Sequence, residues 1–400
     1  MKNLAFYFIL GLSVLRGYLI FLNVPYSILY PATSLLIVLI LFISTFRNYQ
    51  KSLVYLQFKE LNKLIYFNSI LFFFYILSEL FLLFFGITDV SDLETTSLYY
   101  LLLSPLIIYV YRDDFKNFDT ILLVISFLVC ISVIYEIKFY QIEGGYNSLI
   151  EYRQKFRSLE GIGLVGNNFQ LAGVIGDHHD TANVLGMLSI FAFNNFLKSY
   201  KLSFLIIFFL LFISLLLTIS TANILLVILT LFISLLFNKS FKAIFFVCVI
   251  LSVFGYFSQE YVSVLFGFSK KLGSDSNSSA IIGFLTLDDF ISGFFHLFFG
   301  HGTSFDISII KSEIAFIKLL FGYGILHFIV IIRLILFPFS IWRKLNYDIK
   351  FTGEMLALFF GFISLLHYGS IFRISSIFIF FGFYTYALTN MAKVNKLKLM

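Results

Sequence analysis

The chain has 400 residues, of which 60% are hydrophobic and 12% charged, with a formal net charge of +6 and a mean hydropathy of +0.95. A soluble domain is nearer one quarter charged, and it could not bury the side chains of 56 phenylalanines. The composition argues against a soluble and against a disordered chain. It predicts an all-α polytopic membrane protein, because helices satisfy their own backbone hydrogen bonds in lipid.

Apolar runs recur along the chain, and a helix that crosses the bilayer needs about 20 such residues. We predict about twelve spans in a single transmembrane domain covering residues 1–400. The first follows Lys2 without a small-residue cleavage site, so we expect it to be retained. The polar stretch Thr218–Asn223 is expected to form a tight turn. The predicted spans are at about 4–23, 26–46, 64–86, 97–111, 119–140, 178–197, 203–218, 222–237, 243–257, 312–336, 352–368 and 371–389.

Basic residues set the predicted orientation, since cytoplasmic segments of membrane proteins are rich in Lys and Arg. With both termini cytoplasmic, the inner segments carry most of the 28 basic residues. The outer loop at 87–96 carries Asp89, Asp92 and Glu94 and no cation. In this frame two outer loops are enlarged, at about 141–177 and about 258–311.

The first enlarged loop contains three cations within five residues, Arg153, Lys155 and Arg157. Arg153 and Arg157 would share one face of a helix, and guanidinium groups suit phosphate oxygens. A solvated loop segment explains the same charges equally well, because long loops are partly exempt from the charge rule. The two interpretations therefore stay open at this point.

A polar cluster ends this loop, with His178, His179 and Asp180 at the start of the predicted span 178–197. Asp177 is a candidate N-cap, but that role does not explain its three neighbours. A His/Asp cluster could relay protons. We expect no metal, because no spacing typical of metal ligands recurs elsewhere in the chain. The two cysteines lie in apolar runs and indicate neither a disulfide framework nor a metal site.

The second enlarged loop combines cations, imidazoles and carboxylates. It contains Lys270, Lys271, His301 and Asp306, and Glu313 follows at the start of the predicted span 312–336, where a carboxylate suits the helix dipole. Ionisable residues inside predicted spans are costly in lipid and are functional candidates by default. They are Arg16, Glu79, Glu136, Lys318, His327, Arg333, His367 and Arg373.

These features resemble the O-antigen polymerase and O-antigen ligase superfamily, with its two enlarged outer loops. The motifs that carry the resemblance are Arg157-x15-Gly173, then His179-x3-Asn183 with the hairpin Leu217–Ala222, then Phe299-Gly300-His301-Gly302, and finally Ser312-Glu313 with Phe321-Gly322-Tyr323-Gly324-Ile325. Two positions depart from the family pattern. Thr221 and the pair Ser279-Ala280 stand where the family often has arginine, so Lys270 or Lys271 would have to supply the charge of the second loop.

The resemblance implies a glycosyltransferase that joins polyprenyl-pyrophosphate-linked oligosaccharide repeat units at the outer face of the bacterial plasma (inner) membrane. The product would be a surface polysaccharide, O-antigen or capsule. The expected general base is His301, with His179 and Glu313 behind it. The residues expected to bind pyrophosphate and glycan are Arg153, Arg157, Lys270, Lys271, His178, Asp306 and Arg373.

The implied chemistry needs no cofactor, because the energy resides in the glycosyl phosphate bond. Expected partners are the lipid-linked glycan, membrane lipid, a flippase and a chain-length regulator, and no nucleic acid. HExxH, GxSxG and P-loop motifs are absent from the sequence, which disfavours intramembrane proteolysis and ATP hydrolysis.

Three alternatives remain open from the sequence. A ligase-type transferase that moves glycan from polyprenyl pyrophosphate to another acceptor shares the architecture and the chemistry, and sequence barely separates it from a polymerase. A lipid-linked glycan flippase or transporter also suits twelve helices, although transporters commonly show internal repeats and none is visible. A membrane scaffold predicts no effect of substitutions at Arg157 or His301.

Overall fold

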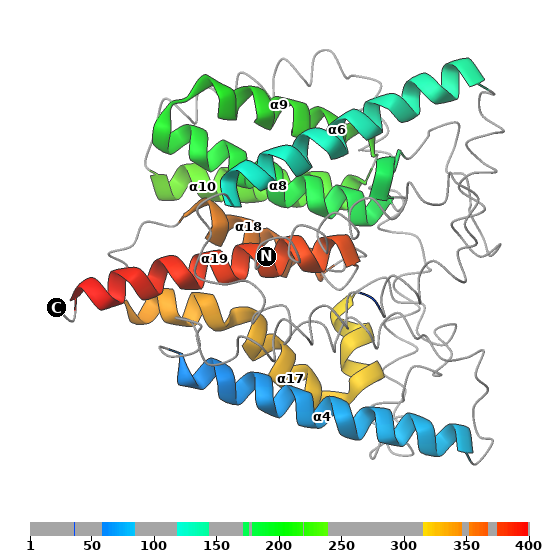
Figure 1. Cartoon of the computed structure of the whole chain (residues 1–400), viewed down its shortest axis with the longest axis vertical. Coiled ribbons are helices and arrows are strands. Elements are labelled where there is room, and N and C mark those ends of the chain that lie inside the picture. The colour runs from blue at the N-terminus through cyan, green and yellow to red at the C-terminus, as the bar shows by residue number, and fades with distance from the viewer. Residues whose placement is uncertain are drawn as a thin grey trace.

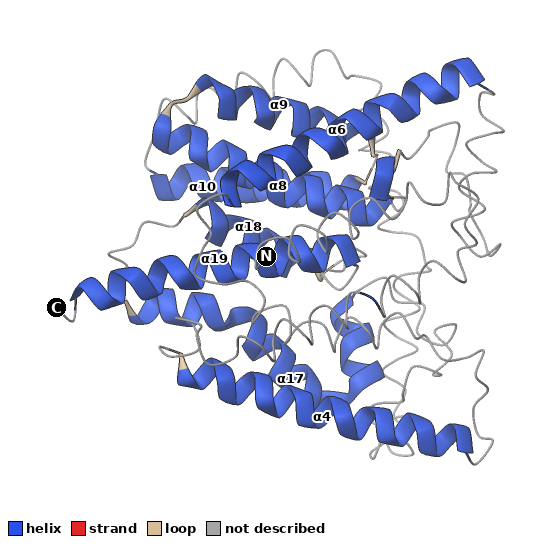
Figure 2. Ribbon diagram, viewed as in Figure 1, coloured by secondary structure: helices blue, strands red, loops and turns tan. Residues whose placement is uncertain are grey.

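A computed structural model of the chain describes residues 36, 58–84, 118–143, 171–175, 178–218, 220–238, 315–345, 352–366 and 374–398. Within these ranges the fold is helical and contains no strand (Figure 2). The described elements are α4 (Lys59–Phe84), α6 (Phe118–Glu143), the short 3-10 turn η3 (Gly173–Ile175), α8 (His178–Ser199), α9 (Leu202–Leu217), α10 (Thr221–Asn238), α17 (Ala315–Lys344), α18 (Gly353–Ser364) and α19 (Ile374–Lys398).

Each predicted span that these ranges reach contains a helix, although α18 ends at Ser364, before the predicted end at 368. The predicted division between 203–218 and 222–237 is confirmed, because α9 ends at Leu217 and α10 begins at Thr221. Helix α17 runs eight residues beyond its predicted end at 336, since it continues through Pro338 to Lys344. The predicted spans at about 4–23, 97–111 and 243–257, nearly all of 26–46, and the loop at 258–311 lie outside the described residues.

One helical stretch among the described residues, Gly324–Lys344, is both long and apolar enough to cross a membrane. Shorter apolar helices occupy Thr120–Glu136, Leu202–Leu217, Ala222–Leu236 and Gly353–Ser364. Apolar side chains also point outward in helical stripes. On α6 the stripe contains Val124, Phe127, Leu128, Ile131 and Tyr135, and on α10 it contains Leu225, Leu229, Phe232 and Leu236.

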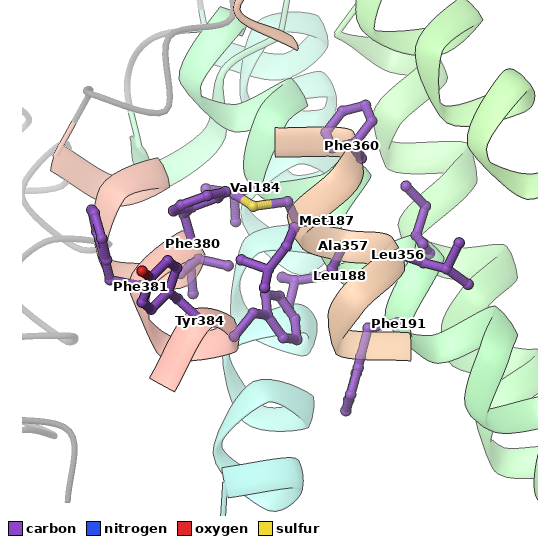
Figure 3. Packing of buried hydrophobic residues seen from close by; sticks show 14 of the residues in the cluster. Val184, Met187, Leu188, Phe191, Leu356, Ala357, Phe360, Phe380, Phe381 and Tyr384 are labelled. Atoms are coloured by element: carbon purple, nitrogen blue, oxygen red, sulfur yellow. The ribbon is translucent and has the colours of Figure 1, made fainter. Parts of the chain in front are cut away.

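The helices lie alongside one another (Figure 1). Helices α6, α9 and α10 surround α8, while α18 lies between α8 and α19, and α17 and α4 lie beyond α19. Helix α8 is the centre of the packing, because nearly its whole length is buried. Figure 3 shows Met187 and Phe191 of α8 among side chains of α18 and α19.

Gly186 allows this close packing. A Cβ atom placed there would lie 2.5 Å from Cζ of Phe360 on α18 and 3.0 Å from Cγ2 of Val227 on α10. Helix α8 is thus in contact with two neighbours at a position where a larger residue does not fit. The absence of a side chain, rather than a favourable side-chain contact, sets the spacing of these three helices.

Helices α8 and α10 pack in a constant register. His179 faces Ser220, Gly186 faces Val227, and the amide oxygen of Asn194 accepts from the hydroxyl of Ser234 at 3.4 Å. The two helices therefore run in the same direction and stay level over four turns of helix. The same register brings Asn183 of α8 level with Asn223 of α10.

Helix α17 contains an elbow at Gly324, whose φ of 79° and ψ of 165° suit glycine and not an L side chain. The rings of Phe316 and Phe328 lie 6.2 Å apart, whereas a straight helix would separate their Cα atoms by about 18 Å. Beyond the elbow, Nε2 of His327 lies 2.9 Å from Oδ1 of Asn68 on α4. The bent helix is thus tied to α4 by a buried polar pair.

Replacing Gly186 with alanine should destabilise the fold by about 1–3 kcal/mol through overpacking against Phe360. The matched control is Gly353→Ala, where the new Cβ would meet its nearest neighbours at 3.2–3.3 Å and needs a much smaller shift of the surroundings. Apparent melting temperatures of the detergent-solubilised variants measure the difference. Equal melting temperatures for Gly186→Ala and Gly353→Ala would contradict this account of α8 packing.

Candidate functional site

The candidate site is a group of polar side chains at the end of the bundle where α8 begins. Four elements meet there: the C-terminal part of α6, the turn η3, the connection between α9 and α10, and the first turn of α19. Most of the side chains involved are buried. Burial of polar groups is costly unless they are hydrogen-bonded, so the pattern of partners indicates what each group does.

Glu136 of α6 holds the chain segment that leads to α8. One carboxylate oxygen, Oε2, accepts the backbone N–H groups of Ala172 and Gly173, both at 2.8 Å. Ser132, one turn earlier on α6, accepts the N–H group of Val174 at 3.0 Å. Charge-assisted hydrogen bonds of this kind are stronger than neutral ones, so α6 clamps three successive backbone amides.

Gly173 is required at the centre of this clamp. Its φ is +55°, and a Cβ atom there would lie 2.5 Å from Oγ of Ser132. Thr181 of α8 closes the turn by donating to the carbonyl oxygen of Ala172 at 2.6 Å. Glycine is therefore required at this position of the Arg157-x15-Gly173 motif, because the backbone approaches α6 closely and has a positive φ.

Asp180 stabilises the start of α19 from a different helix. Its Oδ1 accepts the backbone N–H of Ser376 at 3.0 Å and also accepts the hydroxyl of the same residue. The first N–H groups of a helix lack partners within the helix, and a carboxylate beside them also suits the helix dipole. Asp180 thus acts as a cap contributed across the bundle, which accounts for one member of the His178–Asp180 cluster.

The two histidines of the cluster lie together at the first turn of α8, with ring centroids 3.8 Å apart. His178 is buried and His179 is half-buried. Nδ1 of His179 lies 3.4 Å from the hydroxyl oxygen of Ser220, which precedes α10. The side-chain amide of Asn223 donates to the same hydroxyl at 3.1 Å.

Asn183 lies one turn further along α8, and its side chain is fully buried. Within the part of the chain that the structure describes, neither polar atom of its side-chain amide has a hydrogen-bond partner. The second amide at this level, Asn223, also leaves its oxygen without a partner there. Buried amides without hydrogen-bond partners are rare in protein interiors. They continue the polar contact between α8 and α10 for one turn beyond His179.

Of the site residues predicted from the sequence, the structure brings together His178 and His179. The other candidates lie outside the described residues: Arg153, Arg157, Lys270, Lys271, His301, Asp306, Glu313 and Arg373. The candidate cap Asp177 lies outside them as well. Among the described residues, no group of three or more His, Cys, Asp or Glu side chains could hold a metal ion.

The clamp of Glu136 and Ser132, the cap from Asp180 to Ser376, and the role of Ser220 were not predicted. One signal was available, because Ser132 and Glu136 are four residues apart and therefore share a face of α6. Their partners are 36 to 42 residues away in sequence, and no periodicity indicates such a pairing.

The site thus contains two kinds of polar group. The carboxylates of Glu136 and Asp180 bind backbone amides and hold the elements in place, whereas the imidazoles can donate or accept hydrogen bonds. A scan of the chain against protein-family models and a search of curated proteins both give no match. The chemistry of the site therefore has to be argued from these side chains and from the sequence motifs.

Replacing Glu136 with alanine should lower stability by about 2–5 kcal/mol, because two buried N–H groups lose their acceptor. Glu136→Gln should lose less stability, since the oxygen of a side-chain amide can still accept hydrogen bonds from these N–H groups. The matched control is Ser126→Ala, because Ser126 is buried on the same helix and donates to its own helix at Leu122. Melting temperatures and protease sensitivity report the loss. A Glu136→Ala variant as stable as Ser126→Ala would show that the clamp is unimportant.

Proposed function

We propose that this chain is a multi-pass membrane glycosyltransferase that polymerises polyprenyl-pyrophosphate-linked oligosaccharide repeat units into a surface polysaccharide, O-antigen or capsule. The reaction takes place at the outer face of the bacterial plasma membrane. One observation carries the proposal: Gly173 of the first motif, and His179 and Ser220 of the second, belong to one polar site at the end of the bundle where α8 begins.

The apolar frame supports the membrane part of the proposal. The stripes on α6 and α10 expose large apolar side chains, and Gly324–Lys344 is long enough to span a bilayer. Exposed apolar stripes of this length are unfavourable in water and favourable against lipid. A chain with 12% charged residues has few groups that would resist insertion.

The directions of the helices agree with the predicted orientation. At the end assigned to the cytoplasm, Lys344 of α17 pairs with Glu60 of α4 at 3.3 Å, and Asn390 of α19 donates to Glu354 of α18 at 3.0 Å. At the opposite end, α8 contacts Ser220 and Ser376. This grouping supports placing the polar site at the end that the charge rule assigns to the outside.

In the proposed reaction, a sugar hydroxyl of one lipid-linked glycan attacks the anomeric carbon of another, and polyprenyl pyrophosphate leaves. The departing phosphate gains charge that nearby donors must neutralise, and Arg157 and Arg153 are the proposed donors. The attacking hydroxyl needs a general base, for which His301 is the first candidate and Glu313 the second. Lys270, Lys271, His178, Asp306 and Arg373 are proposed to bind the remaining phosphate and glycan groups.

The clamp on Gly173 anchors one end of the predicted loop that carries Arg157. Arg157 precedes Gly173 by sixteen positions in the sequence, and Glu136 fixes that glycine to α6. A catalytic cation on a loop is useful when one end of the loop is anchored to a rigid element. In this proposal, the Arg157-x15-Gly173 motif contains both the cation that binds phosphate and the glycine that holds one end of the loop.

Arg157→Ala tests the enzyme in a cell whose surface glycan depends on this chain. Long glycan chains should vanish from gels while single repeat units persist, because units are still made and exported but not joined. Lys201→Ala is the matched control, since Lys201 is an exposed cation at the opposite end of the bundle, and it should leave the chain-length ladder intact. Long chains at the normal level in Arg157→Ala, with expression verified, would remove Arg157 from the mechanism.

The orientation can be tested separately with single cysteines in a background lacking Cys130 and Cys248. Asp275→Cys should react with an impermeant thiol reagent on intact cells, because position 275 belongs to the second enlarged outer loop. Lys201→Cys should react only after the membrane is permeabilised. The reverse pattern would place the polar site on the cytoplasmic side and overturn the proposed location of the reaction.

A further inference from the structure

We propose that Ser220 and Asn223 are positioning residues that hold His179 with its proton on Nε2, so that His179 donates a hydrogen bond and does not act as a general base. The inference rests on the proposed function for its chemical consequence, but not for the proton position itself. The sequence predicted His179 as a candidate general base. The structure assigns it a different role, that of a hydrogen-bond donor.

The hydrogen bonds of Ser220 favour one position for the proton of the His179 imidazole. Its hydroxyl oxygen accepts from the side-chain amide of Asn223 at 3.1 Å, which leaves the hydroxyl proton to be donated. Nδ1 of His179 lies 3.4 Å from that oxygen and can accept the hydroxyl proton, whereas a protonated Nδ1 would leave this proton without an acceptor among the described residues. A neutral imidazole has one N–H group and one acceptor nitrogen. An Nδ1 that accepts from Ser220 therefore leaves the proton on Nε2.

The orientation of the Asn223 amide decides between this arrangement and its reverse. If the amide were turned over, its oxygen would accept from Ser220, and His179 would have to donate through Nδ1. The turned amide would then leave its buried NH₂ group without a partner among the described residues, whereas the present orientation leaves an oxygen. Buried donors without partners are rarer than under-satisfied acceptors, which favours the proton on Nε2.

The surroundings make the arrangement rigid. Ser220 and Asn223 are 3% and 0% exposed, and the backbone N–H of Ser220 donates to the hydroxyl of Thr218 at 3.4 Å. The register of α8 and α10 continues below the site through Gly186 and Val227. The ring of His178 lies against the ring of His179 at 3.8 Å and limits its rotation. Such fixed neighbours commonly set the tautomer of a functional histidine.

A neutral histidine that donates through Nε2 suits the departing phosphate. The bond between the anomeric carbon and the phosphate oxygen breaks, and its electron pair stays on that oxygen. The acceptor hydroxyl oxygen forms the new bond to the carbon, and its proton passes to a separate base, for which His301 is proposed. His179 keeps its proton throughout and stabilises the charge on the leaving phosphate. Fixing the tautomer in advance avoids reorganisation during the reaction.

The proton position can be measured without any activity. Solid-state NMR of the full chain in lipid vesicles, with ¹⁵N-labelled histidine, distinguishes protonated from unprotonated ring nitrogens, and a His179→Gln variant identifies the signals of His179. We expect Nε2 to be protonated and Nδ1 unprotonated. Ser220→Ala should give a mixture of tautomers, and Ser220→Thr should restore the single form because threonine retains the hydroxyl. A proton on Nδ1 in the native chain, or an unchanged tautomer in Ser220→Ala, would overturn the inference.

The chemical consequence is tested with purified chain and a polyprenyl-pyrophosphate-linked repeat unit. Ser220→Ala should lower kcat by roughly tenfold with little change in KM, as expected for one lost hydrogen bond, and Ser220→Thr should recover most of the rate. In a His179→Ala background, Ser220→Ala should have no additional effect. The matched control is Ser189→Ala, because Ser189 is buried on α8 and donates within its own helix to Leu185.

The two failures are distinguishable. If the native chain forms no polymer while the NMR result is as expected, the proposed function is wrong and the proton position stands. If the native chain forms polymer but Ser220→Ala keeps its full kcat, the donor role of His179 is wrong and the polymerase stands. A loss of rate in Ser220→Ala that persists in the His179→Ala background would also contradict action through His179.

Discussion

The carboxylate of Glu136, which accepts two successive backbone N–H groups at 2.8 Å, is the interaction on which the site depends. It fixes the turn at Gly173, which leads directly into the first turn of α8. A buried carboxylate without partners would be strongly unfavourable, and two amides with one oxygen provide the compensation. The entry to α8 is therefore held by electrostatics in surroundings that otherwise pack through apolar contacts.

From that entry, α8 connects the site to the rest of the molecule. Asp180 caps α19, His179 reaches the start of α10, and Gly186 permits close approach of α18. His179 and Gly186 are seven residues apart and share one face of α8, whereas Asp180 faces α19. A shift of α8 would disturb the cap, the histidine pair and the apolar packing together, so the candidate chemistry and the stability of the bundle are linked through this element.

The sequence predicted the helices well where apolar runs are long and bounded by polar residues. The separation of α9 from α10 at Thr218–Ser220 followed from the polar residues between two apolar runs. The elbow at Gly324 did not, because a glycine in an apolar run is compatible with a straight helix. The predicted end of this span at 336 was also wrong, because α17 continues through Pro338 to Lys344.

Within the site, residue type was predictable but partners were not. His178 and His179 were recognisable as polar residues at a membrane boundary, and Gly173 as part of a motif. The pairing of Asp180 with Ser376 joins positions 196 residues apart, and the pairing of His179 with Ser220 joins positions 41 apart. Such contacts depend on which helices become neighbours, and hydropathy periodicity carries no information about that choice.

The central proposal is that this chain alone forms glycosidic bonds by cleaving the glycosyl phosphate bond of polyprenyl-pyrophosphate-linked glycans. The most direct measurement reconstitutes the purified chain in lipid vesicles, adds a polyprenyl-pyrophosphate-linked oligosaccharide, and follows product length and released polyprenyl pyrophosphate together. The account predicts a ladder of products that differ by one repeat unit, with one polyprenyl pyrophosphate released for each linkage formed. Folded chain that neither extends the oligosaccharide nor releases the lipid would contradict it.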